Sequence, residues 1–518
     1  MLRRFEALLH RALARLDALG NRWFGPASNP LYQSGTIVVL LYLVLLVTGL
    51  WLILFYRIGS PWESVGRITA DLWLGNWVRA LHRFSSDAAV VATAVHALRM
   101  FVQGRNSGAR TLAWVSGGLL LGLTALCGWT GYVMVWDTFG EWLAREAARI
   151  VDALPIVSEP ISRAFTGETP VPSVFFFLNL FAHIGLPLAM GVVFWLHVKR
   201  LNRAAFLPPR VLRWVVLGAL LALAVAQPLA MAPKADPFVR PAAVPVDLFF
   251  GFWLPVAAEV GPLWSLAIVT VAGGLLLLVP ALAARRGADR PAPSVVDESI
   301  CVGCVQCSID CPYGAIEMFP RVHPRSDQVA RVDPSLCVSC GICAASCAPM
   351  GVGPAGRTGR DQMTDVHEFT ADPRRRPGEV VAVVCDHGAG ASRGRDLAST
   401  GAAIYPVTCA GNVHTSVIEM LLRAGAGGVI VVSCPPRDCR HREGPIWLVE
   451  RIYQGREAEL QERVDRRRVR IAYANAAETK AAAAAVRDFG REVAGLGEVT
   501  RDLEMPHTVC EPRDEVVR

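Results

Sequence analysis

The sequence predicts a multidomain protein in which an all-α transmembrane bundle precedes a cysteine-rich α+β domain and a small α/β domain. Three observations predict this fold class. The 518 residues are 53% hydrophobic and 19% charged, which is too apolar for a chain that is soluble throughout. All of the 14 cysteines except Cys127 come after residue 300. Strand-like runs that alternate with helix-like runs begin only at Glu379.

The apolar part of the sequence contains six stretches of about 20 residues, the length that a helix needs to cross a bilayer. They lie near residues 35–56, 76–101, 111–135, 174–198, 211–231 and 262–284. Residues 1–22 carry Leu and Phe at helical spacing between arginines, which predicts an amphipathic helix on the membrane surface. Together these segments form a predicted membrane domain, residues 1–284.

Positive charge is distributed unevenly between the two ends of these spans. Sixteen Lys and Arg side chains lie on the side of the N-terminus, against seven on the other side. The positive-inside rule therefore predicts that the N-terminus and the later domains lie in the cytoplasm. The membrane is expected to be a bacterial or archaeal cytoplasmic membrane. Because the cytoplasm is reducing, the late cysteines are expected to be metal ligands and not disulfides. The net charge of +7 then needs no nucleic-acid partner to explain it.

Two cysteine motifs in residues 301–347 share the spacing C-x2-C-x2-C-x3-C. This spacing is typical of proteins with two 4Fe-4S clusters, in which the fourth cysteine of each motif binds the other cluster. Structural zinc is the alternative, but zinc sites use two separated pairs of ligands. The predicted ligands are Cys301, Cys304, Cys307 and Cys347 for the first cluster, and Cys337, Cys340, Cys343 and Cys311 for the second. The domain, residues 285–352, resembles the bacterial 2[4Fe-4S] ferredoxins and is therefore expected to have their α+β fold.

Four histidines occur at matched spacing in two of the expected spans. His82 and His96 are 14 residues apart in one span, and His183 and His197 are 14 residues apart in another. Fourteen residues make almost four full helical turns, so each pair lies on one face at two depths. A single intramembrane histidine is more often a packing residue. Two such helices that face each other predict two bis-histidine haem sites.

The residues around these histidines add a more specific signal. The stretches VRALHRFSSDAAVVATAVHALRMF, GWTGYVMVWD, LPIVSEPISRAFTGETP and FAHIGLPLAMGVVFWLHVKR resemble the cytochrome b of bc complexes and photosynthetic bf complexes, over about residues 20–270. The resemblance implies an outer haem on His82 and His183, an inner haem on His96 and His197, and pairing with a second copy. It also implies contacts of Arg79 and Arg83 with haem propionates, and room for the porphyrins at Gly35, Gly49, Gly117 and Gly131.

Two departures from that family concern quinol and a further haem. The family carries Pro-Glu-Trp-Tyr at its outer quinol site, whereas this sequence has PVDL at residues 245–248. Asp247 is therefore either a substitute proton carrier or the cap of a loop. Gln33 stands about where the bf branch has the cysteine that attaches an extra haem, so that haem is not expected.

Four later cysteines, Cys385, Cys409, Cys434 and Cys439, each lie at or near the end of a strand-like run. The carboxyl ends of parallel strands meet at one edge of a sheet, so these thiols are expected to gather there around an iron–sulfur cluster or zinc. The stretch TCAGNVHTSVIEMLLRAGAGGVIVVSCPPRDCRHREG resembles the delta subunit of methyl-viologen-reducing hydrogenase. The resemblance spans about residues 379–490 and implies a 2Fe-2S cluster that exchanges electrons with a flavin subunit; zinc and metal-free thiols stay open as alternatives.

The order of the segments predicts a chain of electron carriers, with residues 353–378 as a linker, 379–500 as the last domain and 501–518 as a tail. We expect a subunit of a quinone/quinol oxidoreductase that passes electrons between membrane quinone and a cytoplasmic flavoprotein or iron–sulfur partner of the heterodisulfide-reductase type. Its catalytic partner is expected to be another subunit, because the sequence has neither a G-x-G-x-x-G after a strand nor a P-loop. The alternatives are the membrane anchor of a hydrogenase or formate dehydrogenase, and a redox-sensing scaffold without steady turnover.

Overall fold

The computed structural model of the chain describes residues 2–154, 159–165, 171–236, 238, 247–285, 291–324, 326–392, 395–456 and 458–497. The chain divides into two compact units, Met1–Pro291 with Pro312–Gly314, and Ala292–Cys311 with Ala315–Arg518. The predicted tail lies outside the described residues, as do residues 286–290 of the stretch that joins the membrane domain to the cysteine-rich domain.

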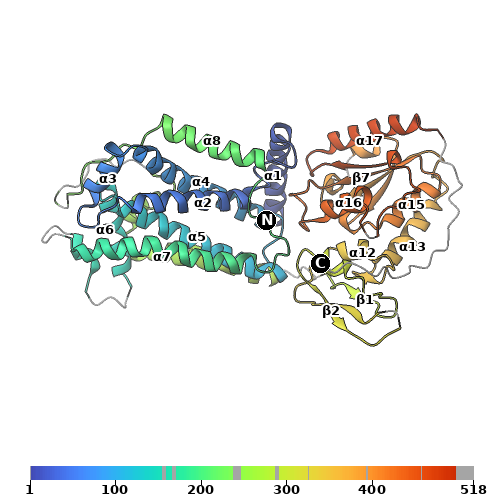
Figure 1. The fold of residues 1–518 in the computed structure, drawn as a ribbon, viewed down its shortest axis with the longest axis horizontal. Helices are drawn as coiled ribbons and strands as arrows, with labels where there is room; N and C mark the ends of the chain where they lie inside the picture. Colours follow the sequence, from blue (N-terminus) through green and yellow to red (C-terminus); the bar gives the residue numbers. More distant parts are fainter. Residues whose placement is uncertain are drawn as a thin grey trace. The chain divides into compact units, whose positions relative to one another are not determined.

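The first unit is helical, as the sequence predicts. Its helices are α1 (Leu2–Phe24), α2 (Ser34–Ile53), α3 (Pro61–Ala70), α4 (Gly75–Val102), α5 (Thr111–Val133), α6 (Thr138–Asp152), α7 (Ser173–Val198), α8 (Arg210–Ala226), α9 (Leu254–Val260) and α10 (Pro262–Arg285). The long helices run side by side, and α2 packs against α4 while α5 packs against α7 (Figure 1). These two helix pairs bring the expected haem ligands and glycines together.

Four of the described helices are long and apolar enough to cross a membrane. They are Ser34–Ile53, Gly108–Val133, Ser173–Val198 and Pro262–Leu282. The other two predicted spans are also helices, but they differ from these four. Helix α4 has 28 residues and carries charged side chains such as Arg83 and Arg99, which lower its mean hydropathy. Helix α8 has 17 residues, slightly fewer than the roughly 20 that span a bilayer without tilt or thinning.

Helix α1 is attached to the bundle by a buried ion pair. Asp17 accepts a hydrogen bond from Arg99 of α4 at 2.6 Å, and both side chains are almost completely buried. The guanidinium of Arg99 also lies 4.9 Å above the ring of Tyr32. Apolar side chains of α1, among them Leu19 and Trp23, are exposed. The ion pair thus holds α1 against the bundle, and its exposed apolar side chains form the kind of surface with which an amphipathic helix enters a membrane interface.

The cysteine-rich part of the second unit has two similar halves, each with one cysteine motif, one short helix and one pair of strands. Strand β2 (Ile316–Pro320) pairs with β3 (Gln328–Val332), and β1 (Val295–Val296) pairs with β4 (Val352–Gly353), both antiparallel. A four-residue helix follows the start of each cysteine motif, α11 (Gln306–Ile309) and α12 (Ile342–Ala345). Short strands and short helices of this kind match the predicted α+β domain.

The segment that the sequence predicts as a linker contains a helix, α13 (Gly359–Thr370). Thr358 and Asp361 form a capping box at its start, with both reciprocal hydrogen bonds present. Val366 of α13 is fully buried in the core of the following domain, and Phe369 packs against the same core. Because only one face of α13 is apolar, the segment is polar on average, and its composition alone predicts a linker.

The last domain is an α/β sandwich with a parallel sheet, so the predicted fold class is confirmed. The strands β5 (Val380–Cys385), β6 (Ala403–Val407), β7 (Gly428–Ser433) and β8 (Val469–Tyr473) are ordered β6-β5-β7-β8. One face is covered by α13, α15 (Thr415–Arg423) and α16 (Gly444–Tyr453), and the other by α14 (Arg395–Ala398) and α17 (Thr479–Ala494). Chain order reverses between β5 and β7, which is where open α/β sheets bind their ligands.

The ring of Phe489 in α17 is fully buried against the sheet. We expect Phe489→Ala to lower the free energy of unfolding of the last domain by about 3–5 kcal/mol, because the substitution leaves a cavity. The temperature at which this domain loses resistance to protease measures the change in detergent-purified protein. Ile446→Ala is the matched control, since Ile446 is 42% exposed and its loss should change the free energy by less than about 0.5 kcal/mol.

Candidate cofactor sites

Two pairs of histidines face each other inside the helical unit. The imidazole centroids of His82 on α4 and His183 on α7 are 6.4 Å apart, and those of His96 and His197 are also 6.4 Å apart. Bonds from histidine nitrogen to transition metals are about 2 Å long. A metal ion between two rings at this separation can therefore be bound by both. The 14-residue spacing places the two pairs at two levels along the same helices.

A hydroxyl group holds the outer nitrogen of three of these four imidazoles. The Oγ atoms lie close to Nδ1 at 2.8 Å for Thr48 and His82, 3.1 Å for Ser116 and His197, and 2.9 Å for Thr130 and His183. Each hydroxyl donates its own proton to a carbonyl of its helix, as Thr48 does to Val44 at 2.7 Å. The oxygen therefore accepts the Nδ1 proton, which leaves the lone pair of Nε2 free to bind a metal.

The four glycines that the resemblance singles out lie against the imidazoles. A Cβ added at each glycine would approach the imidazole Cε1 to 2.9 Å at Gly35 and His96, 3.3 Å at Gly49 and His82, 3.2 Å at Gly117 and His197, and 3.0 Å at Gly131 and His183. These glycines thus make room for the histidine rings. Room for porphyrins, which the resemblance implies, stays a prediction. Each glycine follows a Ser or Thr, and this repeated pair is the signal that could have revealed the hydroxyl groups.

Asp247 is held by the backbone of its own loop and by two side chains. Its Oδ1 accepts hydrogen bonds from the amides of residues 249, 250 and 251 at 2.9, 2.5 and 3.0 Å. Its Oδ2 binds Arg83 at 2.5 Å and accepts a hydrogen bond from Tyr132. Burial alone would raise the pKa of Asp247, but these hydrogen bonds and the Arg83 charge keep the pKa below its ordinary value. The contacts are those of a loop cap, the second of the two roles considered; the preceding Pro245 and Val246 lie outside the described residues.

The two arginines that are expected near haem propionates both bind groups of the protein. Arg79 donates to the hydroxyl of Thr69 at 3.2 Å and to the carbonyl of Leu229 at 3.0 Å. Arg83 pairs with Asp87 as well as with Asp247. A contact with a propionate stays a prediction for both.

The cysteines of the two ferredoxin-like motifs are grouped crosswise. One cavity is lined by Cys301, Cys304, Cys307 and Cys347, with apolar neighbours such as Met318 and Val352. Cys340 and Cys343 interact electrostatically with Cys337 and Cys311. Backbone amides point at the sulfurs, for example Ala315 at Cys311 and Gly351 at Cys347, both at 3.3 Å. Burial raises the pKa of the Cys343 thiol to about 12, so a thiolate there needs a bound cation to be stable.

The four late cysteines gather at the carboxyl edge of the parallel sheet. Cys385 ends β5 and Cys434 follows β7, and their sulfurs are 3.7 Å apart at the point where chain order reverses. Cys409 and Cys439 are neighbours, because a Cβ added at Gly444 would lie 3.2 and 3.4 Å from their sulfurs. All four thiols are buried. A hydrogen bond from Cys434, with amides of the adjacent loops, lowers the pKa of Cys385.

Among the residues that the structure describes, no three His, Cys, Asp or Glu side chains converge closely enough to hold a single metal ion. A polynuclear cluster does not require such convergence, because different thiolates bind different irons. The residues present can therefore serve as the ligands of iron–sulfur clusters.

Comparison with known proteins gives matches for all three parts. The chain is 30% identical over 210 residues to the cytochrome b6 of Porphyra purpurea, which is 39% of this chain and 95% of that protein. The family model for cytochrome b/b6/petB matches residues 22–205. The chain belongs to the cytochrome b/b6 family. A solved structure described as a hyperthermophilic respiratory Complex III is 19% identical, with a TM-score of 0.40 over 49% of this chain and 75% of that one.

The remaining matches show that this cytochrome b/b6 family member is a fusion, as predicted. A 4Fe-4S dicluster domain matches residues 300–351, and the delta subunit of methyl-viologen-reducing hydrogenase matches residues 382–497. The cytochrome b family implies haem b, and the dicluster domain implies 4Fe-4S clusters. The family match ends at residue 205, before α8, whereas the sequence resemblance extends to about residue 270.

The glycines beside the histidines allow a direct test of the haem sites. A side chain at Gly35 would displace the imidazole of His96, so we expect Gly35→Val to lose about half of the b haem. A pyridine haemochrome assay of the purified protein gives the haem content per chain. Gly122→Val on α5 is the matched control, because an added Cβ there meets nothing within 4 Å. Full haem content in both variants would show that His96 does not bind haem.

Proposed function

We propose that this protein passes electrons between a cytoplasmic redox partner and membrane quinone. The observation that carries this proposal is the pair of facing histidine sites stacked along α4 and α7, in the same chain as twelve grouped cysteines. The cytochrome b/b6 family supports membership of a membrane redox complex. The catalytic partner is another subunit, and quinone is the membrane substrate.

The proposed cofactors are two b haems, two 4Fe-4S clusters and one 2Fe-2S cluster. When bound, these groups supply one-electron carriers. One haem would take His82 and His183, and the other His96 and His197, each through Nε2. The first 4Fe-4S cluster would be held by Cys301, Cys304, Cys307 and Cys347, and the second by Cys311, Cys337, Cys340 and Cys343. The third cluster would be held by Cys385, Cys409, Cys434 and Cys439.

The chain's own residues prepare the haem sites for this role. The hydroxyls of Thr48, Ser116 and Thr130 orient three of the imidazoles and hold their Nδ1 protons. Such outer hydrogen bonds raise the basicity of the ligating nitrogen and keep the ring in place. These residues therefore support electron transfer and do not themselves carry out bond chemistry.

The thiol groups of the second unit support a continuous route for electrons. Cys409 of the last domain lies close enough to Cys340 of the cysteine-rich part to interact with it electrostatically. The third cluster and the second 4Fe-4S cluster would thus be neighbours. We propose that electrons pass from there to the first 4Fe-4S cluster and then to the haems.

The partner is proposed to be a cytoplasmic flavoprotein of the heterodisulfide-reductase type, docked on the last domain. Supporting this, the last domain matches the delta subunit of methyl-viologen-reducing hydrogenase. The same match favours a second candidate, the membrane anchor of a hydrogenase, in which only the electron donor differs. The cytoplasmic position of the N-terminus and of the second unit follows from the positive-inside rule and belongs to this proposal. So does pairing of two copies through the bundle.

Two haems at different depths would couple electron transfer to the membrane potential. An electron that moves between them crosses part of the bilayer, where a charge changes energy by about 2.3 kcal/mol per 100 mV across the full membrane. With quinol as the donor to low-potential clusters, the membrane potential would drive the uphill step. With the partner as donor, reduction of quinone at the outer face would separate charge.

Cofactor counting followed by rapid kinetics tests the proposal. Purified protein should show two b haems per chain in a dithionite-minus-oxidised spectrum and about ten non-haem irons. Mixing with a quinol or with the reduced partner in a stopped-flow instrument should change the haem spectrum within a catalytic turnover. Cys434→Ser should remove about two irons and leave the haems unchanged.

Three results would contradict the proposal. Fewer than two haems would remove the transmembrane route, and about four irons would remove the relay. Haems that stay unreduced on the timescale of turnover, with all cofactors present, would favour a redox-sensing scaffold.

A further inference from the structure

The cysteine-rich part and the last domain of the second unit are joined by a buried interface. Trp447 of α16 packs with Cys340 and Ile342 in one apolar cluster. The side-chain amide of Asn412 donates to the carbonyl of Gly341 at 2.8 Å. Gly341 has a φ of +77°, and a Cβ added there would lie 2.5 Å from Asn412. The two surfaces are thus in direct van der Waals contact around one set of cluster cysteines.

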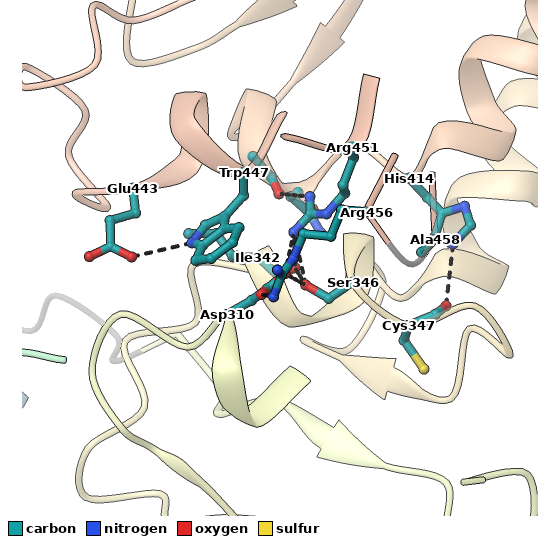
Figure 2. Close-up of polar contacts among 12 residues, drawn as sticks. Asp310, Ile342, Ser346, Cys347, His414, Glu443, Trp447, Arg451, Arg456 and Ala458 are labelled. Atoms are coloured by element: carbon teal, nitrogen blue, oxygen red, sulfur yellow. Dashed lines mark hydrogen bonds and ion pairs between the residues drawn. The ribbon is translucent and has the colours of Figure 1, made fainter. Parts of the chain in front are cut away.

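Arg451 of α16 lies at the centre of this interface and is completely buried (Figure 2). Its Nη2 donates to Ser346 Oγ at 2.8 Å, to the carbonyl of Ile342 at 3.2 Å and to Asp310 Oδ2 at 3.3 Å. Its Nη1 donates to the carbonyl of Gly411 in its own domain at 3.3 Å. Arg451 therefore connects the last domain to both halves of the cysteine-rich part.

The partners of Arg451 stand next to cluster cysteines in the sequence. Asp310 precedes Cys311, and Ile342 precedes Cys343, while Ser346 precedes Cys347 of the first group. The guanidinium also interacts electrostatically with Cys343 itself. Cys311 and Cys343 belong to the second group, with Cys337 and Cys340, so two of the three partners stand beside the second cluster site. A positive charge from the last domain is thus buried beside the second cluster site.

The three charged side chains that meet at Asp310 do not cancel. Asp310 is 1% exposed and pairs with Arg451 and with Arg456, so one carboxylate faces two guanidinium groups. Arg456 also stacks over the ring of Trp447, with its Cζ 4.4 Å from the centroid. Among Asp310, Arg451 and Arg456, one positive charge is in excess. Charges act strongly on their neighbours in such an interior, because water is not there to screen them.

We propose that Arg451 raises the reduction potential of the 4Fe-4S cluster held by Cys311, Cys337, Cys340 and Cys343, so that the last domain tunes the cluster on which it docks. Reduction adds a negative charge to the cluster, and a nearby positive charge stabilises that state. The inference rests on the proposed function only in requiring that both 4Fe-4S clusters are present.

Redox titration of the whole detergent-purified protein, followed by EPR, tests the inference. Arg451→Gln removes the positive charge and should lower the potential of one 4Fe-4S signal. Asp310→Asn removes the negative charge and should raise the potential of the same signal. We expect each shift to change the ratio of reduced to oxidised cluster about tenfold at fixed potential, which is about 59 mV for a one-electron couple.

The opposite signs separate electrostatics from damage to the fold. Both substitutions break the same buried ion pair, so a purely structural effect would move the signal in the same direction or reduce the iron content in both. Arg451→Lys keeps the charge and loses the forked hydrogen bonds. It should keep a near-native potential while the protein unfolds at a lower temperature.

Two further variants serve as controls. Arg321 donates to the carbonyl of Cys301 in the first group, so Arg321→Gln should lower the potential of the other 4Fe-4S signal. Arg470 pairs with Glu492 on the surface of the last domain, and Arg470→Gln should move neither signal.

The inference is overturned by shifts of the same sign in Arg451→Gln and Asp310→Asn, or by no shift, while the iron content stays full. It is also overturned if Arg451→Gln moves the signal that Arg321→Gln moves. A wild-type protein without two 4Fe-4S signals would instead contradict the proposed function.

Discussion

The helical unit depends on one local constraint, the close approach of a helix backbone to a histidine ring. An imidazole can lie against a neighbouring helix only where that helix has a glycine, and the hydroxyl one residue earlier then reaches Nδ1. At three of the four positions this hydrogen bond is present, with Thr48, Ser116 and Thr130 as acceptors. The pairing of α2 with α4 and of α5 with α7 is the packing that satisfies this constraint at both levels.

The second unit depends on a related constraint, the burial of ionised groups. Its thiols line apolar sites, where thiolates are unstable unless a cation accepts their charge. Arg451 and Asp310 add ionised groups at the same interface. One contact of 3.3 Å joins them, and their other hydrogen bonds go to neighbouring groups such as Ser346. Such a buried pair contributes little net stability, but removal of either partner alone is costly. The ion pair therefore favours the one arrangement of the two surfaces in which both charges are paired.

Much of this arrangement is predictable from spacing alone. The 14-residue interval between histidines specifies a helix face and two depths, and strand-end cysteines specify one edge of a parallel sheet. Contacts between distant segments are less predictable. Nothing in the sequence near Arg451 indicates that its partner is Asp310, since the two are joined only by tertiary packing. The helix of residues 359–370 was likewise hidden, and the sequence left open whether Asp247 caps its loop or carries protons, because short polar side chains serve caps, ligands and loops equally well.

The helix pair α2 and α4 and the helix pair α5 and α7 contribute the same groups to the two histidine sites. Residues of α2 and α4 supply one glycine-supported imidazole at each level, and residues of α5 and α7 supply the other. Neither pair contains a complete site, so each could enter the bilayer as a helical hairpin without being able to retain a prosthetic group. If the proposed haems bind between these imidazoles, only association of the hairpins creates the binding sites, and the bound groups would then act as crosslinks between them. Maturation of the membrane domain would thereby be coupled to delivery of its prosthetic groups, in the same way that metal binding is coupled to folding in small metalloproteins.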